Sequence, residues 1–389
     1  MNRRDLLKLG AASTVATSLP QIAPAEDRQD FETEQRSQSS ILQGATDSSR
    51  TQFSVVAKKG MISTFTAKNS QGDVIFPDSV AELNHPDLET LIYKVKFSGL
   101  QLNEDYQLNI LDPSLEIIDQ RDFKMLDTSK KDLRFAICSC MKAKRHRSAI
   151  WKDLVAQSPD MIFFVGDAVY ADRDGVAGEE GSKRLWRQFS ENRAILDIYF
   201  SQKLIPILAT WDDHDFGQNN GGITYPYVQE AQRNFTQFFA QDENHCESLE
   251  SGPGVSQAMI LGGQQFLFLD CRSFRQPNGS DDRWGHWGET QETWMHQKIR
   301  DFEGPTFLIN GSQFFPRFIR KESLSRNHVE NYKAFIKEIS QMSQRVILIS
   351  GDVHYSEISR IQDFGYTTYE ITSSSMHSKG APGAPFIVA

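Results

Sequence analysis

The chain has 389 residues and a formal net charge of −9, with 39% hydrophobic and 24% charged residues. Such a length usually exceeds one compact domain, and the composition is that of a globular protein without an internal apolar run long enough to span a bilayer. An acidic chain is poorly suited to docking a polyanion, so we expect no stable nucleic-acid complex.

The N-terminus carries an export-like pattern. A twin arginine, Arg3-Arg4, precedes a mildly apolar stretch from Leu9 to Leu19, and Ala23-Pro24-Ala25 has the small-x-small form of a cleavage site. This order is typical of a Tat export signal. We predict residues 1–25 to be a Tat-type signal peptide read by the Tat machinery, and the mature protein to be periplasmic or secreted without a transmembrane span. A short basic amphipathic helix is the alternative.

The next two segments differ in pattern. Residues 26–50 are polar with few apolar positions, which predicts a flexible leader. Residues 51–130 form short alternating segments broken by turn residues, which indicates a small all-β sandwich domain. Within it, Tyr93–Leu100 followed by Asp105–Leu108 resembles the E-to-F strand corner of fibronectin type III domains, where a tyrosine hydroxyl pins a tight turn. An unrelated β-sandwich is the alternative.

Residues 131–389 alternate apolar strands with helical stretches, which predicts a layered α/β domain. The expected strands cover residues 133–138, 161–165, 205–210, 257–261, 265–270, 306–310, 346–350, 357–362 and 367–373. The expected helices lie near residues 148–157, 182–200, 227–240, 290–301 and 327–341.

Three of these strands end in acidic residues or histidine. Asp167 and Tyr170 follow one strand, the run Trp211–Asp215 follows the next, and Asp352 and His354 follow a third. In open α/β sheets, sites form at the carboxyl ends of the strands. Oxygen ligands mixed with imidazole suit di- or trivalent metals, and paired metals suit phosphate-ester hydrolysis. The sequence therefore predicts a metallophosphoesterase.

The residue types suggest separate roles. Asp167 is expected to bridge two metal ions, and the phenolate of Tyr170 to bind one of them, which favours a ferric ion. Three carboxylates within Trp211–Asp215 repel one another unless a cation neutralises them, and Asp213 is the candidate ligand. His214 is the candidate to bind phosphate or to protonate the leaving alkoxide.

Two further sets of polar side chains have competing interpretations. Asn219 or Asn220 is a candidate carbonyl ligand of a second metal, and an ordinary turn is the alternative. Arg272 and Arg275 follow another strand and are candidates to contact substrate phosphate. For the two arginines, structural or surface ion pairing is equally compatible with the sequence.

Cys140 follows the strand at residues 133–138, near the expected position of Asp167. A metal would convert it to a thiolate ligand, whereas a free cysteine is more often a small buried hydrophobe. In an exported protein the four cysteines would also be compatible with two disulfides, although Cys138 and Cys140 are badly placed to bridge each other. The pairing state of the cysteines stays open from sequence.

Five motifs occur in order along the chain: Ser139-Cys140, Gly166–Tyr170, Trp211–Asp215, Leu269–Arg272 and Gly351–His354. With the Tat-like signal and the fibronectin-like segment, this series resembles the alkaline phosphatase D (PhoD-like) family of metallophosphoesterases. The similarity covers almost the whole chain. Two departures are Cys271, where relatives often carry threonine, and the end at Ala389, where relatives commonly continue into a segment that partly covers the site. The second departure implies a more open site.

The resemblance implies a ferric ion held by Cys140, Asp167, Tyr170 and one downstream ligand, with one or two calcium ions beside it. Zinc, manganese and magnesium are the alternatives. It also implies hydrolysis of small phosphate monoesters or diesters by attack of a metal-bound hydroxide on phosphorus. Two rival functions are a phosphodiesterase or phospholipase D-like enzyme acting on lipid head groups or wall polymers, and a non-catalytic exported binding module.

Overall fold

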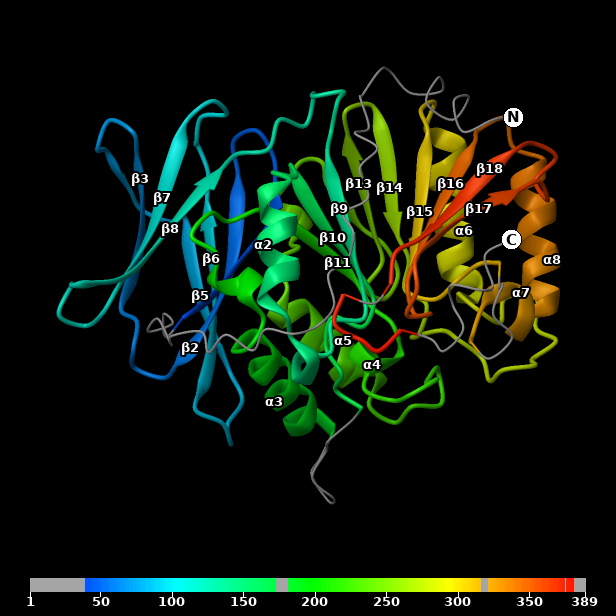
Figure 1. Cartoon of the computed structure of the whole chain (residues 1–389), viewed down its shortest axis with the longest axis horizontal. Coiled ribbons are helices and arrows are strands. Elements are labelled where there is room, and N and C mark those ends of the chain that lie inside the picture. Colours follow the sequence, from blue (N-terminus) through cyan, green and yellow to red (C-terminus); the bar gives the residue numbers. More distant parts are fainter. Residues whose placement is uncertain (1–38, 173–180, 316–320, 375, 381–389) are drawn as a thin grey trace. The chain divides into compact units, whose positions relative to one another are not determined.

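The computed structural model describes residues 39–172, 181–315, 321–374 and 376–380 (Figure 1). The predicted signal peptide and most of the predicted leader lie outside the described residues. Ser37–Ala389 forms one unit. Among the described helices, none combines the length and the apolar character needed to cross a membrane.

The N-terminal part is a sandwich of two antiparallel sheets. Their strand orders are β1-β2-β6-β5 and β4-β3-β7-β8. The strands are β1 (Ser40–Thr46), β2 (Thr51–Lys58), β3 (Thr64–Asn69), β4 (Val74–Ile75), β5 (Ser79–Asn84), β6 (Thr90–Phe97), β7 (Asp105–Leu111) and β8 (Ile117–Lys124). Apolar residues such as Phe53, Phe65 and Phe123 fill the space between the sheets. The all-β expectation for this part is confirmed.

The predicted strand corner is also present. The backbone amide of Gln101 donates a hydrogen bond of 2.6 Å to the hydroxyl of Tyr106. Tyr106 is 3% exposed and follows the turn between β6 and β7. Its hydroxyl therefore pins that turn, as in the fibronectin-like corner that the sequence indicates.

One boundary of the predicted leader is wrong. Residues 40–46, assigned to a flexible leader, form β1, which is buried and pairs with β2. The strand is held from outside the sandwich as well, because Arg193 donates hydrogen bonds to the hydroxyl oxygen and the carbonyl of Ser40, both at 2.9 Å. A composition average over residues 26–50 hides this short strand among polar neighbours.

The C-terminal part is the layered α/β domain that the alternation predicts. Its strands are β9 (Phe135–Cys138), β10 (Met161–Val165), β11 (Ile207–Thr210), β12 (Leu249–Ser251), β13 (Gln257–Leu261), β14 (Gln264–Phe268), β15 (Thr306–Asn310), β16 (Val346–Ser350), β17 (Glu357–Ile361) and β18 (Thr368–Thr372). Its helices are α2 (Ser148–Ala156), α3 (Gly181–Arg193), α4 (Asp213–Phe216), α5 (Val228–Phe238), α6 (Gly288–Asp301), α7 (Leu324–Asn327) and α8 (Val329–Ser340). Short 3-10 helices are η1 (Ala143–Arg145), η2 (Asp197–Phe200) and η3 (Glu243–His245).

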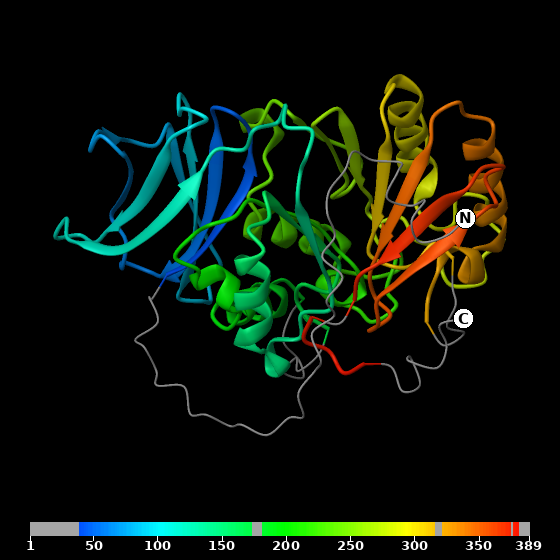
Figure 2. The same cartoon turned by 45° about the horizontal axis from the view of Figure 1, so that its top comes forward.

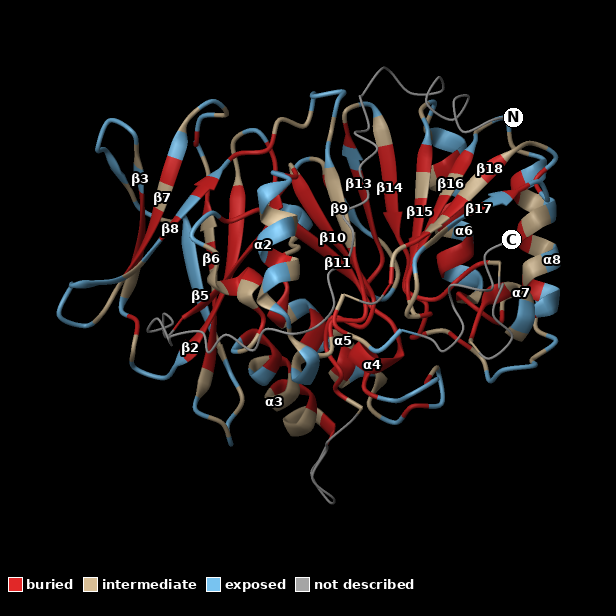
Figure 3. Cartoon of the chain, viewed as in Figure 1, coloured by how far each residue is buried: buried red, intermediate tan, exposed pale blue. Residues whose placement is uncertain are grey.

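Two sheets make the inner layers of this domain. Strands β9, β10 and β11 form a parallel three-stranded sheet. The second sheet has the order β12-β13-β14-β15-β16-β18-β17 and is parallel from β14 through β18. Both are largely buried in Figure 3. In Figures 1 and 2, α2 and α3 lie beside the smaller sheet, and α6 and α8 beside the larger one.

The alternation along β10 explains this layering, since successive side chains of a strand face opposite sides. Ile162 and Phe164 join the core that includes residues of α2, α3 and α5, whereas Phe163 and Val165 join a second core with residues of β14, β15 and β16. Both faces of the strand are therefore covered, as its continuous apolar run predicts.

Glycines bring the strand ends together. A Cβ at Gly351 would lie 2.5 Å from the carbonyl oxygen of Val165, and one at Gly166 would lie 2.6 Å from the Cβ of Asp212. Only glycine fits such close approaches of backbone segments. The loops after β10, β11 and β16 thus meet at one place.

Candidate metal centre

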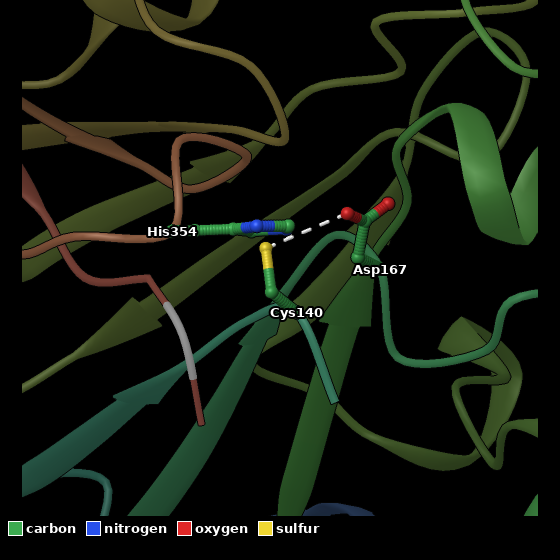
Figure 4. A group of neighbouring side chains, drawn as sticks. All are labelled: Cys140, Asp167 and His354. Atoms are coloured by element: carbon green, nitrogen blue, oxygen red, sulfur yellow. Dashed lines mark hydrogen bonds between the residues drawn. The ribbon is translucent and has the colours of Figure 1, made fainter. Parts of the chain in front are cut away.

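Two groups of possible ligands share one carboxylate. Cys140, Asp167 and His354 have ligand atoms within 4.8 Å of one another, and so do Asp167, Asp213 and His214. The sulfur of Cys140 lies 3.4 Å from Oδ2 of Asp167, and Figure 4 shows the His354 ring beside that pair. Asp167 belongs to both groups, so the two groups of possible ligands are adjacent.

Tyr170 lies beside the first group. Its hydroxyl is 3.5 Å from Oδ2 of Asp167 and 3.5 Å from Nε2 of His354. The hydroxyl of Ser378 lies 2.8 Å from the same phenol oxygen and positions it. The tyrosine hydroxyl is therefore within reach of a cation held by Cys140 and Asp167.

The backbone at these positions is strained. Cys140, Asp167, Asp352 and His354 have φ values of 56°, 55°, 66° and 61°. Residues other than glycine rarely occupy this left-handed region, and where they do, the surrounding structure must hold them there. These four candidate ligands account for most of the seven non-glycine residues with positive φ in the described part of the chain. Such conformations cluster at functional sites.

The charges of the cluster favour a bound cation. Burial raises the pKa of Asp167 well above its ordinary value, with Cys140 and Asp213 adding to the effect. Burial also raises the pKa of the Cys140 thiol, helped by Asp352. Oδ1 of Asp167 and Oδ1 of Asp213 are buried without a hydrogen-bond partner among the described residues. Buried carboxylate oxygens need such a partner or a metal ion, so the donor set fits a metal.

The three carboxylates after β11 take different positions. Oδ1 and Oδ2 of Asp215 accept hydrogen bonds from the amides of Val169 and Asp212, at 2.7 and 3.0 Å, and this holds the loop. Burial raises the pKa of Asp213, but Arg272 and His214 outweigh it and bring the pKa to about 2. Asp213 is therefore the ionised member of the run that faces Asp167.

His214 is oriented by a residue that the sequence analysis missed. Its Nδ1 lies 2.8 Å from Oδ1 of Asp172, and each side chain is 7% exposed. The imidazole also packs on the Tyr170 ring, with centroids 4.2 Å apart. The available signal was the position of Asp172 in the same loop as Asp167, two residues after Tyr170.

Asp352 does not join either group. Its Oδ1 accepts a hydrogen bond of 3.1 Å from Nζ of Lys321, a residue that the sequence analysis also missed. Among the described residues, the two groups of possible ligands do not include Asp352. Asn219 is exposed, as is Asn220, whose backbone amide donates a 2.8 Å hydrogen bond to Asp213. A carbonyl ligand from Asn219 or Asn220 therefore stays a prediction, made on side chains that are exposed.

Arg272 is buried and forms ion pairs with two acidic residues. Its side chain is 1% exposed, and it donates hydrogen bonds to Asp212, at 2.7 Å from Nε, and to Glu322, at 2.9 Å. Arg275 is equally buried and pairs with Glu322 at 2.9 Å. Structural ion pairing, one of the alternatives left open by the sequence, is therefore present at both arginines, and the phosphate contact of Arg272 stays a prediction.

The cysteines are not paired with one another. Cys138, Cys140, Cys246 and Cys271 are all buried and free. The disulfide alternative is therefore wrong. Cys271 instead donates from its sulfur to Oδ1 of Asp212, at 3.3 Å.

The chain thus combines a layered α/β fold, a fibronectin-like sandwich ahead of it, and acidic, thiol and imidazole groups at the strand ends. A solved structure titled "Structure of PhoD" is similar to this chain with a TM-score of 0.68 and 17% sequence identity, over 87% of this chain and 77% of that one. Alkaline phosphatase D of Bacillus subtilis (strain 168) is 20% identical over 303 residues.

The structural match shows that the chain shares the fold of that protein, and both matches agree with the PhoD-like resemblance that the motifs carry. The alignment with alkaline phosphatase D covers 66% of this chain and 50% of the relative, so the chain spans about half the length of that protein. No family model matches the chain.

Proposed function

We propose that this protein is an alkaline phosphatase D-like phosphoesterase that hydrolyses phosphate monoesters or diesters at the metal centre described above. The proposal rests on the two comparisons and on one observation in particular. Asp167 belongs to both groups of possible ligands, and one of its oxygens is buried without a partner among the described residues. A carboxylate shared by two cations is what a two-metal phosphoesterase requires.

The residues of the site divide into those that would hold metal ions and one that would transfer a proton. Cys140, Asp167, Tyr170 and His354 would hold one ion, and Asp167 with Asp213 would hold a second. When bound, the metal ions supply the attacking hydroxide and stabilise negative charge on the phosphoryl oxygens. Because phosphoryl transfer depends mainly on positioning and charge stabilisation, no covalent side-chain nucleophile is needed.

His214 is the group assigned to proton transfer. Asp172 accepts from Nδ1, fixes the ring orientation and stabilises positive charge on the imidazole. Proton transfer to the leaving alkoxide then falls to Nε2. His214 also lies in the second group of possible ligands. The metal content of His214→Ala therefore distinguishes a general acid, whose loss leaves the metal bound, from a metal ligand.

The mixed donor set supports a ferric ion at the thiolate and phenolate side and calcium beside the carboxylates. We further propose export by the Tat route and a periplasmic or secreted location, on the basis of the N-terminal sequence pattern.

The test is an assay of metal-analysed protein on an aryl phosphate, a bis-aryl phosphate and a phospholipid. Hydrolysis of an aryl ester that is lost on chelation and restored by metal supports the proposal. A metal-loaded protein that hydrolyses none of the three, but binds phosphate, would instead support a binding module. Turnover of the phospholipid alone would favour the phospholipase alternative.

A further inference from the structure

Lys321 places a positive charge on the rim of the carboxylate cluster. Its Nζ lies 3.1 Å from Oδ1 of Asp352 and 3.1 Å from the Asp352 carbonyl oxygen. Asp352 comes from the loop after β16, two residues before His354, and Lys321 lies three residues before α7. A lysine amine is ordinarily protonated near neutral pH, so this contact pairs an ammonium with the Asp352 carboxylate.

The ammonium of Lys321 contacts a carboxylate oxygen that the sequence motif assigns to a metal ion. The Gly351–His354 motif predicts Asp352 as a ligand, yet among the described residues it is absent from both ligand groups. Its carboxylate is instead engaged by Lys321. Two cations cannot share the same carboxylate lone pair at full strength, so Lys321 and a metal ion compete for Asp352.

Lys321 differs from the other basic side chains that pair with buried acids nearby. Arg272 and Arg275 are each 1% exposed and both are bound to Glu322. Lys321 is 28% exposed, and its ammonium sits on a flexible four-carbon stem. Because Glu322 is the next residue and is tied to two arginines, the backbone at Lys321 is anchored while its side chain is able to turn.

Cys140 and Asp167 both interact electrostatically with Lys321, so an ammonium displaced from Asp352 would remain close to the ligand groups. The neighbouring cluster is made of acidic, thiol, phenol and imidazole groups, so an anionic substrate needs positive charge in addition to the metals. We propose that Lys321 is a substrate-binding residue that pairs with Asp352 until a metal ion displaces it, and that it then binds a non-bridging oxygen of the phosphate. This inference rests on the proposed phosphoesterase function for the identity of the anion.

The experiment measures two equilibria in the full chain. Chelator-treated wild type and Lys321→Gln are titrated with Mn²⁺ by calorimetry, and the Mn²⁺-loaded proteins are then titrated with inorganic phosphate. Lys321→Met is a second neutral variant, and Lys59→Gln on the exposed turn after β2 is the matched control for loss of a lysine charge. Thermal unfolding verifies that each variant is folded.

The two equilibria should move in opposite directions. Without the competing ammonium, Lys321→Gln and Lys321→Met should bind Mn²⁺ about tenfold more tightly. They should bind phosphate about 10- to 100-fold more weakly, because a charge-assisted hydrogen bond is lost. Lys59→Gln should match wild type in both titrations.

Weaker Mn²⁺ binding in the Lys321 variants would overturn the proposal, because it would mean that Lys321 only orients the Asp352 side chain. Unchanged phosphate affinity would overturn the substrate-binding part. Since neither titration depends on turnover, a protein that shows both shifts but hydrolyses no ester would refute the proposed function and leave this inference standing.

Discussion

The pair formed by Asp172 and His214 gives a prediction whose size follows from its geometry. The two side chains are joined at 2.8 Å and each is 7% exposed, so the bond is charge-assisted and poorly screened by solvent. Such a bond contributes about 1.5–3 kcal/mol. If the charge on the imidazole develops in the transition state, Asp172→Asn should lower kcat by about 10- to 150-fold.

The assay is the initial rate on aryl phosphate and bis-aryl phosphate, with metal per chain measured in the same preparation. Asp172→Asn should keep its metal, because Asp172 acts through His214. His214→Ala alone should also keep its metal and lose roughly 100-fold or more in kcat. In that background, adding Asp172→Asn should change kcat by less than about twofold, because the shared interaction is already gone.

A full Asp172→Asn effect in the His214→Ala background would refute this reasoning. Loss of metal from His214→Ala would refute the division between acid and ligand, because it would show that the imidazole holds a cation.

Four further outcomes follow from the site. Chelation should lower Tm more at pH 8 than at pH 5, because burial raises the pKa of Asp167 and brings that of Asp352 to about 6. The metal-free fold therefore loses stability as these carboxyl groups ionise with rising pH. An equal shift of Tm at both pH values in scanning fluorimetry would contradict this. Cys140→Ser should lose iron while the fold survives, and reductant should leave Tm unchanged because the cysteines are free; mass mapping that finds a disulfide would contradict both. Tyr170→Phe should abolish or shift a visible phenolate-to-iron band, and an unchanged spectrum would remove the phenolate from the iron site. Arg272→Met should cost about 3–5 kcal/mol in urea unfolding, because buried Asp212 loses its arginine and Glu322 loses one of its two. An unchanged stability with a raised KM would instead indicate a phosphate contact.

Much of the fold could be predicted from the sequence, because strands that are buried on both faces consist of continuous apolar runs. The runs that became β10, β11 and β16 each end in a polar motif, so the strand ends predicted where Asp167, Asp213 and His354 would meet. The sandwich was readable from its alternation for the same physical reason. β1 was not, because its seven residues follow a long polar segment and are recognisable as a strand only through pairing with β2.

Two residues of the site, Asp172 and Lys321, could not be predicted from the sequence for a different reason. Asp172 and Lys321 lie in loops, where neither a period of 2 nor one of 3.6 constrains the sequence. Their importance comes from contacts across the fold, 42 residues away for Asp172 to His214 and 31 for Lys321 to Asp352. Arg272 shows the reverse case. A basic side chain after a strand suggested a phosphate contact, whereas in the structure this side chain is buried in an ion pair with Asp212.

The shared role of Asp167 is tested most directly by the cation stoichiometry and turnover of wild type against Asp167→Asn, measured on the same preparations by elemental analysis and hydrolysis of an aryl phosphate. We expect at least two cations per chain in the wild type, one for each ligand group. Asp167→Asn should lose both cations and turnover, because this carboxylate belongs to both groups. An Asp167→Asn protein that keeps its cations and hydrolyses the ester at the wild-type rate would contradict the two-metal assignment.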